Sequence, residues 1–340
     1  MATTDTDTYH ALADLLIGAK VAFMLRAMAQ FKVADALADG PKTAEALAEQ
    51  LGLAADRLHR VMRALTQFGV FEELPGGGFR NTPMSDHMRE DMQPSLRDAI
   101  LFLNHDVSLK PWLQIGDTLQ DGVSRFQEIN GGPLFSLFGK DQDLADHFAR
   151  CMRNLYGAQG ARIAAGYPFH RYQNLIDVGG GQGHVLAAIL AAHPDMRGTL
   201  FDIPATAPLG EDFFKAQGLE TRTQVIGGDF FVDVPGEHDA YLVKSVLHDW
   251  DDDKAVAILE TCRRAMPEGA HLLIVEEVLA PGKKVGNPNR LVDLDLMIHL
   301  GGRERTEEEY RAVMERAGFV FTGVRPIEGS FFSVIEGKVA

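Results

Sequence analysis

The chain has 340 residues, of which 46% are hydrophobic and 24% are charged, and its formal net charge is -15. This length is enough for two domains with full cores, and the composition is typical of a globular protein. The acidic balance argues against a broad nucleic-acid surface and against binding to anionic membranes, because both require basic patches.

Cysteine usage and the N-terminal segment indicate a soluble, cytoplasmic protein. The two cysteines, Cys151 and Cys262, are too few and too isolated for a disulfide framework or a zinc site. Residues 1–9 are polar and lack the basic and apolar regions of a signal peptide. The sequence has no apolar run of membrane-spanning length.

The N-terminal quarter of the chain is predicted to be helical with one β-hairpin. An apolar helix over 11–28 carries few charges, so we expect it to be covered on more than one side, by packing against a partner chain. Further helices are expected at 43–51, with Thr43 as the N-cap, and at 56–68. A Pro-Gly-Gly-Gly turn then predicts a hairpin over 71–82, which completes the outline of a winged helix.

A winged helix often reads DNA, and three arginines lie at helical spacing on one side of the second helix. The alternative is a scaffold or dimerisation module with a solvated face. Acidic residues nearby offset the arginines, which favours the alternative. The arginines are Arg57, Arg60 and Arg63, and the acidic residues are Asp39, Glu45, Glu49, Asp56, Glu72 and Glu73.

The rest of the chain is predicted to form a helical connector, 93–166, and an α/β domain, 167–340, after a first domain over 1–92. The last helix of the connector is expected from 143 to about 165. Alternating strands and helices then predict a Rossmann-like, doubly wound, mostly parallel sheet, which binds ligands at the carboxyl ends of its strands. The expected strands are 175–178, 199–201, 223–226, 240–243, 272–275, 320–324 and 331–336, and the clearest helices are 184–192, 252–265 and 306–317.

The first strand of this domain runs into a glycine turn over 177–183, with the sequence D-V-G-G-G-Q-G. Glycines let the backbone approach a ligand where a Cβ would collide. A dinucleotide fingerprint needs a small residue three places after its second glycine, but those places hold His184 or Leu186, and a P-loop motif is also missing. The turn therefore favours a ligand without a pyrophosphate over NAD or FAD. The alternative is a βα turn that binds no ligand.

The ends of the next two strands carry side chains suited to adenosine. Asp202 could accept hydrogen bonds from both ribose hydroxyls. After Gly228, Asp229 could accept from an exocyclic amine and Phe230 could cover an adenine face. Each acid alone would more often be a turn or cap residue. As an ordered set on successive strands, they make S-adenosylmethionine the leading candidate.

The fourth strand is followed by His248, beside Asp249 and a tryptophan. A lone histidine is usually structural, but this one is expected at the ligand edge, where an imidazole can take up a proton near neutral pH. Glu276 ends the fifth strand and could hold a ring nitrogen of the histidine, fixing its tautomer. Glu277 follows it, and the sequence leaves open which of the two does so.

The loop over 301–306 supplies a second candidate carboxylate, Glu304. Thr306 and Glu309 in and after this loop also form a capping-box pattern, so part of the motif is helix architecture.

Together, these segments resemble the family of small-molecule O-methyltransferases that includes the plant caffeic acid, hydroxyindole and bacterial antibiotic O-methyltransferases. The resemblance extends over nearly the whole chain, because a winged-helix front and five motifs occur in family order. The motifs are D-V-G-G-G-Q-G at 177–183, F-D-I-P at 201–204, G-D-F-F at 228–231, L-H-D-W at 247–250 and G-R-E-R-T at 302–306.

The resemblance implies a homodimer formed through N-terminal domains that do not read DNA. It implies S-adenosylmethionine as the cofactor, S-adenosylhomocysteine as its product, and no metal. The implied cofactor-binding residues are Gly179, Gly181, Asp202, Gly228, Asp229, Phe230 and Lys244.

For the reaction, the resemblance implies His248 as the general base, with Glu276 and Glu304 flanking and orienting it, and Asp249 placing the acceptor. Met152, Met297 and His299 stand where the family lines its acceptor pocket. Plant members have an amide side chain at the last of these positions, so their acceptor contacts cannot be copied.

The expected function is an SN2 methyl transfer to a phenolic hydroxyl of a small aromatic acceptor of secondary-metabolite type, with no nucleic acid or membrane as partner. One alternative is a protein of the same fold that uses the cofactor for decarboxylation or hydroxylation. Another is a winged-helix regulator that senses S-adenosylmethionine. The joint presence of His248, Glu276 and Glu304 favours methyl transfer.

Overall fold

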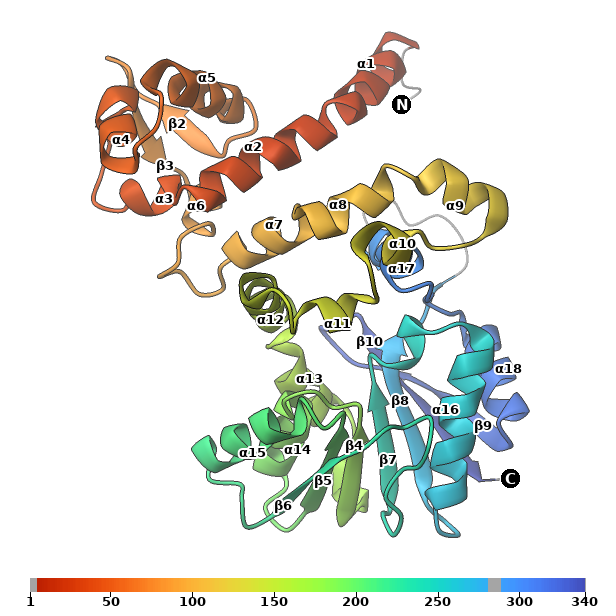
Figure 1. Cartoon of the computed structure of the whole chain (residues 1–340). Helices are drawn as coiled ribbons and strands as arrows, with labels where there is room; N and C mark the ends of the chain where they lie inside the picture. Colours follow the sequence, from red (N-terminus) through yellow and green to blue (C-terminus); the bar gives the residue numbers. More distant parts are fainter. Residues whose placement is uncertain (1–4, 281–288, 340) are drawn as a thin grey trace. The chain divides into compact units, whose positions relative to one another are not determined.

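The computed structural model describes residues 5–280 and 289–339, and the chain forms two compact units (Figure 1). One unit contains Met1–Leu113 and Phe135–Tyr156, and the other contains Gln114–Leu134 and Gly157–Ala340. The residues of the expected helical connector are thus divided between the two units. The first four residues of the polar N-terminal segment lie outside the described part of the chain.

The first unit begins with two apolar helices where the sequence predicted a single one. α1 (Asp5–Leu16) ends before Ile17, and α2 (Gly18–Gln30) begins after it. Four apolar side chains of α1 are 63–76% exposed, and an apolar patch of this kind is typical of a surface that another chain covers. These side chains are Tyr9, Leu12, Leu15 and Leu16.

The predicted winged-helix outline follows. α4 (Ala44–Leu51) and α5 (Ala55–Thr66) precede the hairpin, and the hydroxyl of Thr43 caps α4 by accepting from the amide of Ala46 at 3.3 Å. The hairpin strands pair in a small antiparallel sheet of order β1-β3-β2. The other elements here are α3 (Val33–Ala36), β1 (Lys42–Thr43), β2 (Phe71–Glu73), β3 (Gly78–Asn81), α6 (Pro83–Asp86), α7 (Arg97–Leu103), α8 (Asp106–Trp112) and α12 (Gln142–Tyr156).

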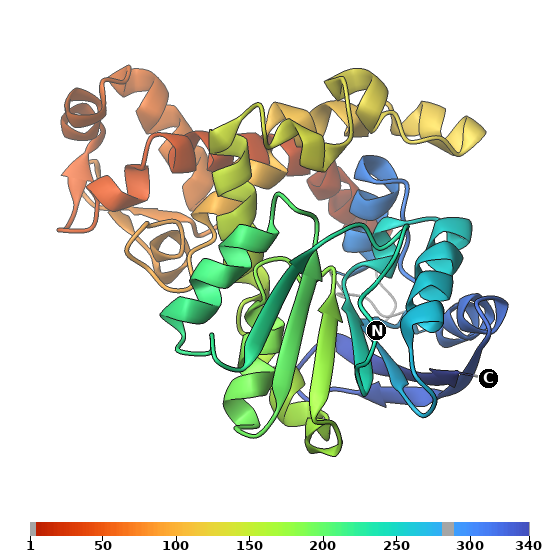
Figure 2. The same cartoon turned by 60° about the horizontal axis from the view of Figure 1, so that its bottom comes forward.

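The second unit is built on a seven-stranded sheet of order β6-β5-β4-β7-β8-β10-β9 (Figure 2). Its first five strands in sequence are parallel, and β10 runs antiparallel to both β8 and β9. All seven predicted strands are present, which confirms the doubly wound class. They are β4 (Asn174–Val178), β5 (Arg197–Asp202), β6 (Thr223–Gly227), β7 (Ala240–Lys244), β8 (His271–Glu277), β9 (Phe319–Pro326) and β10 (Phe332–Val339).

Helices cover both faces of the sheet, as the alternating sequence pattern predicted. The predicted helix from 143 to about 165 is broken after Tyr156, and its second part, α13, belongs to this unit. The helices are α9 (Ile115–Asp121), α10 (Phe126–Asn130), α11 (Leu134–Leu137, which straddles the unit boundary), α13 (Gln159–Gly166), α14 (His184–Ala192), α15 (Ala207–Ala216), α16 (Asp252–Ala265), α17 (Asn289–His299) and α18 (Glu307–Arg316), with short 3-10 turns η1 (Phe169–Arg171) and η2 (Leu247–Asp249).

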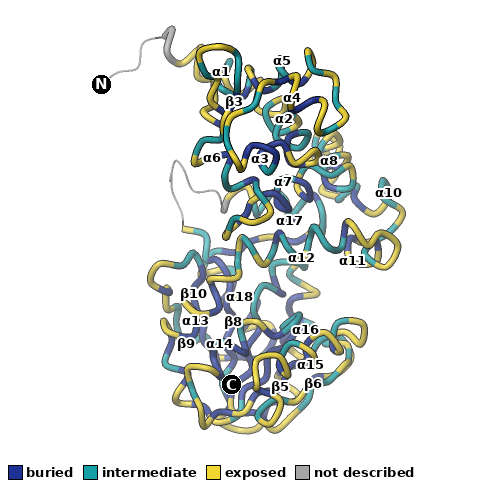
Figure 3. Tube along the Cα trace, turned by 90° about the vertical axis from the view of Figure 1, so that its left-hand side faces the viewer, coloured by how far each residue is buried: buried dark blue, intermediate teal, exposed yellow. Residues whose placement is uncertain are grey.

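Each face of the sheet has its own hydrophobic core because successive strand residues point to opposite faces. In β8, Leu272 and Ile274 join a core with α16 and α18, whereas Leu273 and Val275 join one with α13 and α14. The central strands β4, β7 and β8 are therefore buried along most of their length, whereas the edge strands β6 and β9 are partly exposed (Figure 3). Among the described residues, no helix is both long and apolar enough to cross a membrane.

Candidate active site

The glycine turn after β4 has the backbone shape that only glycine adopts easily. Gly179 and Gly181 have φ of 72° and 60°, in the left-handed region. A Cβ on Gly179 would lie 2.7 Å from a methyl group of Val246, whereas one on Gly181 would meet no atom within 4 Å. Gly181 thus leaves open space beside its backbone, as a turn that cradles a ligand requires.

Asp202 lies at the end of the neighbouring strand and contacts this turn directly. Its Oδ2 accepts a hydrogen bond from the amide of Gly181 at 2.8 Å, and its Oδ1 accepts one from the amide of Ile203 at 2.8 Å. Each oxygen keeps a further lone pair for a ligand hydroxyl. Burial raises the pKa of this carboxyl, although the two amides act in the opposite direction.

The segment after β6 places Gly228, Asp229 and Phe230 near the glycine turn. Phe230 is half-buried and lies under the Gly179 position, with its ring 3.6 Å from where a Cβ there would be. Asp229 is exposed, and one of its oxygens accepts from the amide of Phe231 at 2.9 Å. A Cβ on Gly228 would overlap the ring of Phe201, so only glycine fits there.

A buried acid in the glycine turn was not singled out as a binding residue by the sequence. Asp177 is 1% exposed, and neither of its carboxylate oxygens has a hydrogen-bond partner among the described residues. Burial raises its pKa to about 7, which the nearby Lys244 ammonium partly opposes. Burial also lowers the pKa of Lys244, whose ammonium lies 4.7 Å from the centre of the Phe332 ring. A buried carboxyl without a hydrogen-bond partner is uncommon in a folded protein, so Asp177 joins the residues of interest at this edge of the sheet.

His248 lies at the same edge of the sheet, in η2 directly after β7. Its Nδ1 is 2.9 Å from Oε1 of Glu304, and its Nε2 is 3.5 Å from Oδ1 of Asp249. An ionised Glu304 can only accept, so Nδ1 donates to it and Nε2 is the nitrogen left for proton uptake.

The electrostatics of this group favour a strong base. Burial by itself lowers the pKa of His248, but the hydrogen bond to Glu304 and the charges of Glu276 and Asp249 raise it to about 9. Burial raises the pKa of Asp249 to about 6, with the His248 charge opposing the shift. Burial likewise raises the pKa of Glu304.

Glu276 holds the backbone of the histidine turn and not its ring. Its Oε1 accepts hydrogen bonds from three successive amides, those of Val246, Leu247 and His248, at 3.0, 2.7 and 3.2 Å. Its Oε2 accepts from the hydroxyl of Tyr310 at 2.6 Å. The ring partner expected at the end of the fifth strand is therefore supplied by Glu304, because the strand-end carboxylate is used by the amides.

The loop that carries Glu304 is packed tightly against the histidine turn. A Cβ on Gly302 would overlap the carbonyl oxygen of His248, so glycine is required for this approach. The amide of Arg303 donates to that same carbonyl at 2.9 Å. The capping box of Thr306 and Glu309 is also present, so the loop serves both the site and α18.

His248, Glu276 and Glu304 have ligand atoms within 4.8 Å of one another, a spacing that could suit a metal ion. Both oxygens of Glu276 already accept hydrogen bonds from protein groups, however. A metal would have to displace those four bonds, so the arrangement is better described as a hydrogen-bonded base.

The expected acceptor residues lie on two different helices. Met297 and His299 are on α17, where the His299 ring packs edge-on against the buried Phe126 ring at 5.6 Å and its Nδ1 lies 3.9 Å from Asp295. Met152 is on α12, in the other unit. Their role at an acceptor pocket stays a prediction.

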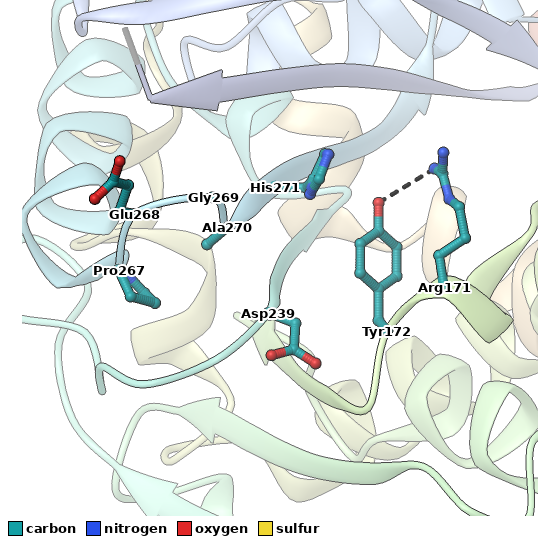
Figure 4. A pocket seen from close by; sticks show the side chains of 8 residues that line it. All are labelled: Arg171, Tyr172, Asp239, Pro267, Glu268, Gly269, Ala270 and His271. Atoms are coloured by element: carbon teal, nitrogen blue, oxygen red, sulfur yellow. Dashed lines mark hydrogen bonds between the residues drawn. The ribbon is translucent and has the colours of Figure 1, made fainter.

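A surface cavity of about 340 Å³ lies at the opposite edge of the sheet, where β7 and β8 begin (Figure 4). Three of its polar side chains are engaged within the protein: Asp239 accepts from two backbone amides, and the Arg171 guanidinium donates to Tyr172 at 3.2 Å. None of the predicted site residues lines it. The residues brought together by the fold are instead at the carboxyl edge of the strands, as predicted.

Comparison with known proteins adds independent information. Residues 112–320 match the model of an O-methyltransferase domain, and residues 13–91 match an O-methyltransferase dimerisation domain. The phenazine O-methyltransferase of Lysobacter antibioticus is 33% identical over 96% of this chain and 95% of its own length.

Solved structures of O-methyltransferases are also similar to this chain over nearly its whole length. The mitomycin 7-O-methyltransferase has a TM-score of 0.92 and 30% identity, with 98% of each chain covered. An O-methyltransferase from neocarzinostatin biosynthesis, in complex with S-adenosylmethionine and 2-hydroxy-5-methyl naphthoic acid, has a TM-score of 0.83 and 30% identity, with 94% of this chain and 96% of the other covered.

Proposed function

Since the chain belongs to the O-methyltransferase family, we propose that it methylates a phenolic hydroxyl of a small aromatic acceptor of secondary-metabolite type, using S-adenosylmethionine. The observation that carries this proposal is the His248–Glu304 pair, held at the same sheet edge as the glycine turn and Asp202. The relative solved with S-adenosylmethionine and a hydroxynaphthoic acid supports both the cofactor and the class of acceptor.

The residues at the glycine turn fit this cofactor. Gly179 and Gly181 would face its methionine part, beside the unpaired carboxyl of Asp177, and Asp202 would bind the ribose hydroxyls. Phe230 would cover the adenine, with Asp229 and Lys244 nearby. When bound, the cofactor supplies an electrophilic methyl group on a cationic sulfonium.

His248 then acts as the base. Its Nε2 removes the proton of the acceptor hydroxyl while Glu304 holds Nδ1 and stabilises the imidazolium that forms. A phenol has a pKa of about 10, so a base with a raised pKa is well matched to it. Asp249, beside Nε2, is placed to orient the acceptor hydroxyl.

We also propose that the enzyme is a homodimer through its N-terminal helices. The match to a dimerisation domain over 13–91 and the exposed apolar side of α1 support this assembly. A cytoplasmic location stays a prediction from the sequence. The two alternatives, other cofactor chemistry and a DNA-binding sensor, are not favoured, because the matched models and relatives are methyltransferases.

Binding of S-adenosylhomocysteine and methyl transfer to a panel of phenols test the proposed function. We expect Asp202→Ala to weaken S-adenosylhomocysteine binding in calorimetry by about 10- to 100-fold, because the carboxylate makes charge-assisted hydrogen bonds. The exposed Asp253→Ala serves as the control and should bind as the wild type does. Wild-type protein that neither binds S-adenosylhomocysteine nor methylates any phenol would contradict the proposal.

The pH dependence of the reaction should reflect the raised pKa of His248. With a pKa of about 9, the ring is protonated and inactive as a base at lower pH, so kcat/KM for the cofactor should rise from pH 7 and level off above about pH 9. Glu304→Gln removes the charge that raises this pKa, so the rise of kcat/KM should move to lower pH. The exposed Glu308→Gln should leave it in place. If the rising part of the pH profile stays at the same pH in Glu304→Gln, this carboxylate does not determine the pKa of His248.

A further inference from the structure

The carbonyl groups on either side of His248 are both held by one side chain, that of Arg305. Its Nη1 donates to the carbonyl of Leu247 at 2.9 Å, and its Nη2 donates to the carbonyl of Trp250 at 2.9 Å. Arg305 is 0% exposed, which is unusual for an arginine and requires every donor to be well paired. The guanidinium therefore brackets the turn that carries the base.

Arg305 is itself held at its guanidinium and at its backbone. Its Nε donates at 2.9 Å to Asp252, the first residue of α16, and its Nη2 lies 2.9 Å from the same oxygen. The backbone of Arg305 forms a parallel bridge with Val278, and its carbonyl accepts from the amide of Leu279 at 2.9 Å. Arg305 is thus tied to α16 and to the segment after β8, neither of which carries His248.

The opposite side of the turn is held by the carboxylate of Glu276, which accepts the amides of Val246, Leu247 and His248 and is fixed by Tyr310. The carbonyls and the amides of the turn are therefore restrained by different elements. Arg305 directly follows Glu304, so a single peptide unit separates the partner of the His248 ring from the clamp on its backbone. This arrangement fixes the ring relative to its carboxylate.

From this geometry we propose that Arg305 is a positioning residue for methyl transfer, which holds the 247–250 turn so that the His248 ring stays in line with Glu304. The proposal rests on the proposed function, because His248 is the base only if the chain transfers methyl groups. Arg305 reaches the two carbonyls and the carboxylate with three different nitrogens of a rigid planar group, whereas lysine has a single nitrogen, so lysine cannot replace it fully.

The raised pKa of His248 supports this role, because it depends on a close Glu304. The charged and titratable groups that face the ring are Glu276 on β8, Asp249 on η2 and Glu304 on the loop, with Lys244 on β7 and Tyr310 on α18 interacting with those carboxylates. If the turn moves away from Glu304, this pKa falls toward its ordinary value.

The test compares Arg305→Lys and Asp252→Asn with the wild type, and uses Arg316→Ala as a matched control. Arg316, the last residue of α18, donates to Asp253 at 2.6 Å, so like Arg305 it holds the start of α16, but it is exposed and has no hydrogen bond to the histidine turn among the described residues. Asp252→Asn changes a partly exposed residue and keeps its size, so it tests the anchoring of Arg305 even if the lysine variant fails to fold. The measurements are S-adenosylhomocysteine binding, kcat and KM with a phenol, and NMR titration of His248 in the cofactor-free protein.

We expect Arg305→Lys to reduce kcat by about 10- to 100-fold, as misplacement of a catalytic group by about 1 Å does, with cofactor binding unchanged. Asp252→Asn should act in the same direction but less strongly. In both variants the NMR pKa of His248 should fall, and in Arg316→Ala it should not. An unchanged pKa and kcat in the two variants, or a loss of cofactor binding parallel to kcat, would overturn the proposal. The titration needs no acceptor, so this outcome is distinct from a wild type that transfers no methyl group.

Discussion

Replacing His248 with glutamine is expected to lower kcat by about two to four orders of magnitude, the usual contribution of a positioned general base. Glutamine preserves much of the size of the side chain but cannot take up a proton at Nε2. The cofactor-binding turn is formed by other residues, Gly181 and Asp202 among them. S-adenosylhomocysteine should therefore bind to His248→Gln nearly as it does to the wild type.

Single-turnover methylation of a phenol, with calorimetry of S-adenosylhomocysteine, measures both parts of this expectation. His170→Gln is a matched control, because that histidine is exposed on η1, which precedes the amino end of β4. It should retain full turnover. If His248→Gln keeps its turnover as well, another group removes the proton and the assignment of the base is wrong.

The strands and many helices of the second unit could be predicted from the sequence because their apolar residues follow regular periods. The helices over 184–192 and 252–265 have the predicted ends. The predictions of two long helices were wrong, however: the helix expected over 11–28 is interrupted at Ile17, and the helix expected from 143 ends at Tyr156. Apolar periodicity continues across both breaks, so it could not reveal them.

The site shows a similar division between local pattern and tertiary structure. The order of the motifs was enough to place His248, Glu276 and Glu304 at one edge of the sheet. Which glutamate reaches the ring depends on how the 301–306 loop returns to η2, and no spacing along the chain encodes that distance. The hydrogen bonds of Tyr310 and Arg305 were missed for the same reason, because within the sequence they read as parts of a helix and its capping motif.

The division of roles between the two glutamates predicts that Glu276→Leu is among the most damaging single changes in the second unit. Leucine would leave three amides and the Tyr310 hydroxyl without their buried acceptor. We expect a loss of about 3 to 5 kcal/mol in the free energy of unfolding, on the scale of removing one member of a buried charged network. Denaturant unfolding followed by tryptophan fluorescence measures it.

Glutamine separates the hydrogen-bonding role of Glu276 from its charge. Glu276→Gln keeps a carbonyl oxygen that can accept from the amides of the turn, and its amide group can donate to the Tyr310 oxygen once that hydroxyl reorients. It should therefore recover most of the stability lost in Glu276→Leu. Glu277→Gln leaves the four bonds of Glu276 in place and should be the milder of the two glutamine variants. If Glu277→Gln were the more damaging, the strand-end residue that supports the turn would be Glu277. If Glu276→Leu unfolded like the wild type, the amides of Val246, Leu247 and His248 would not depend on this carboxylate, and the base would have to be held by the loop alone.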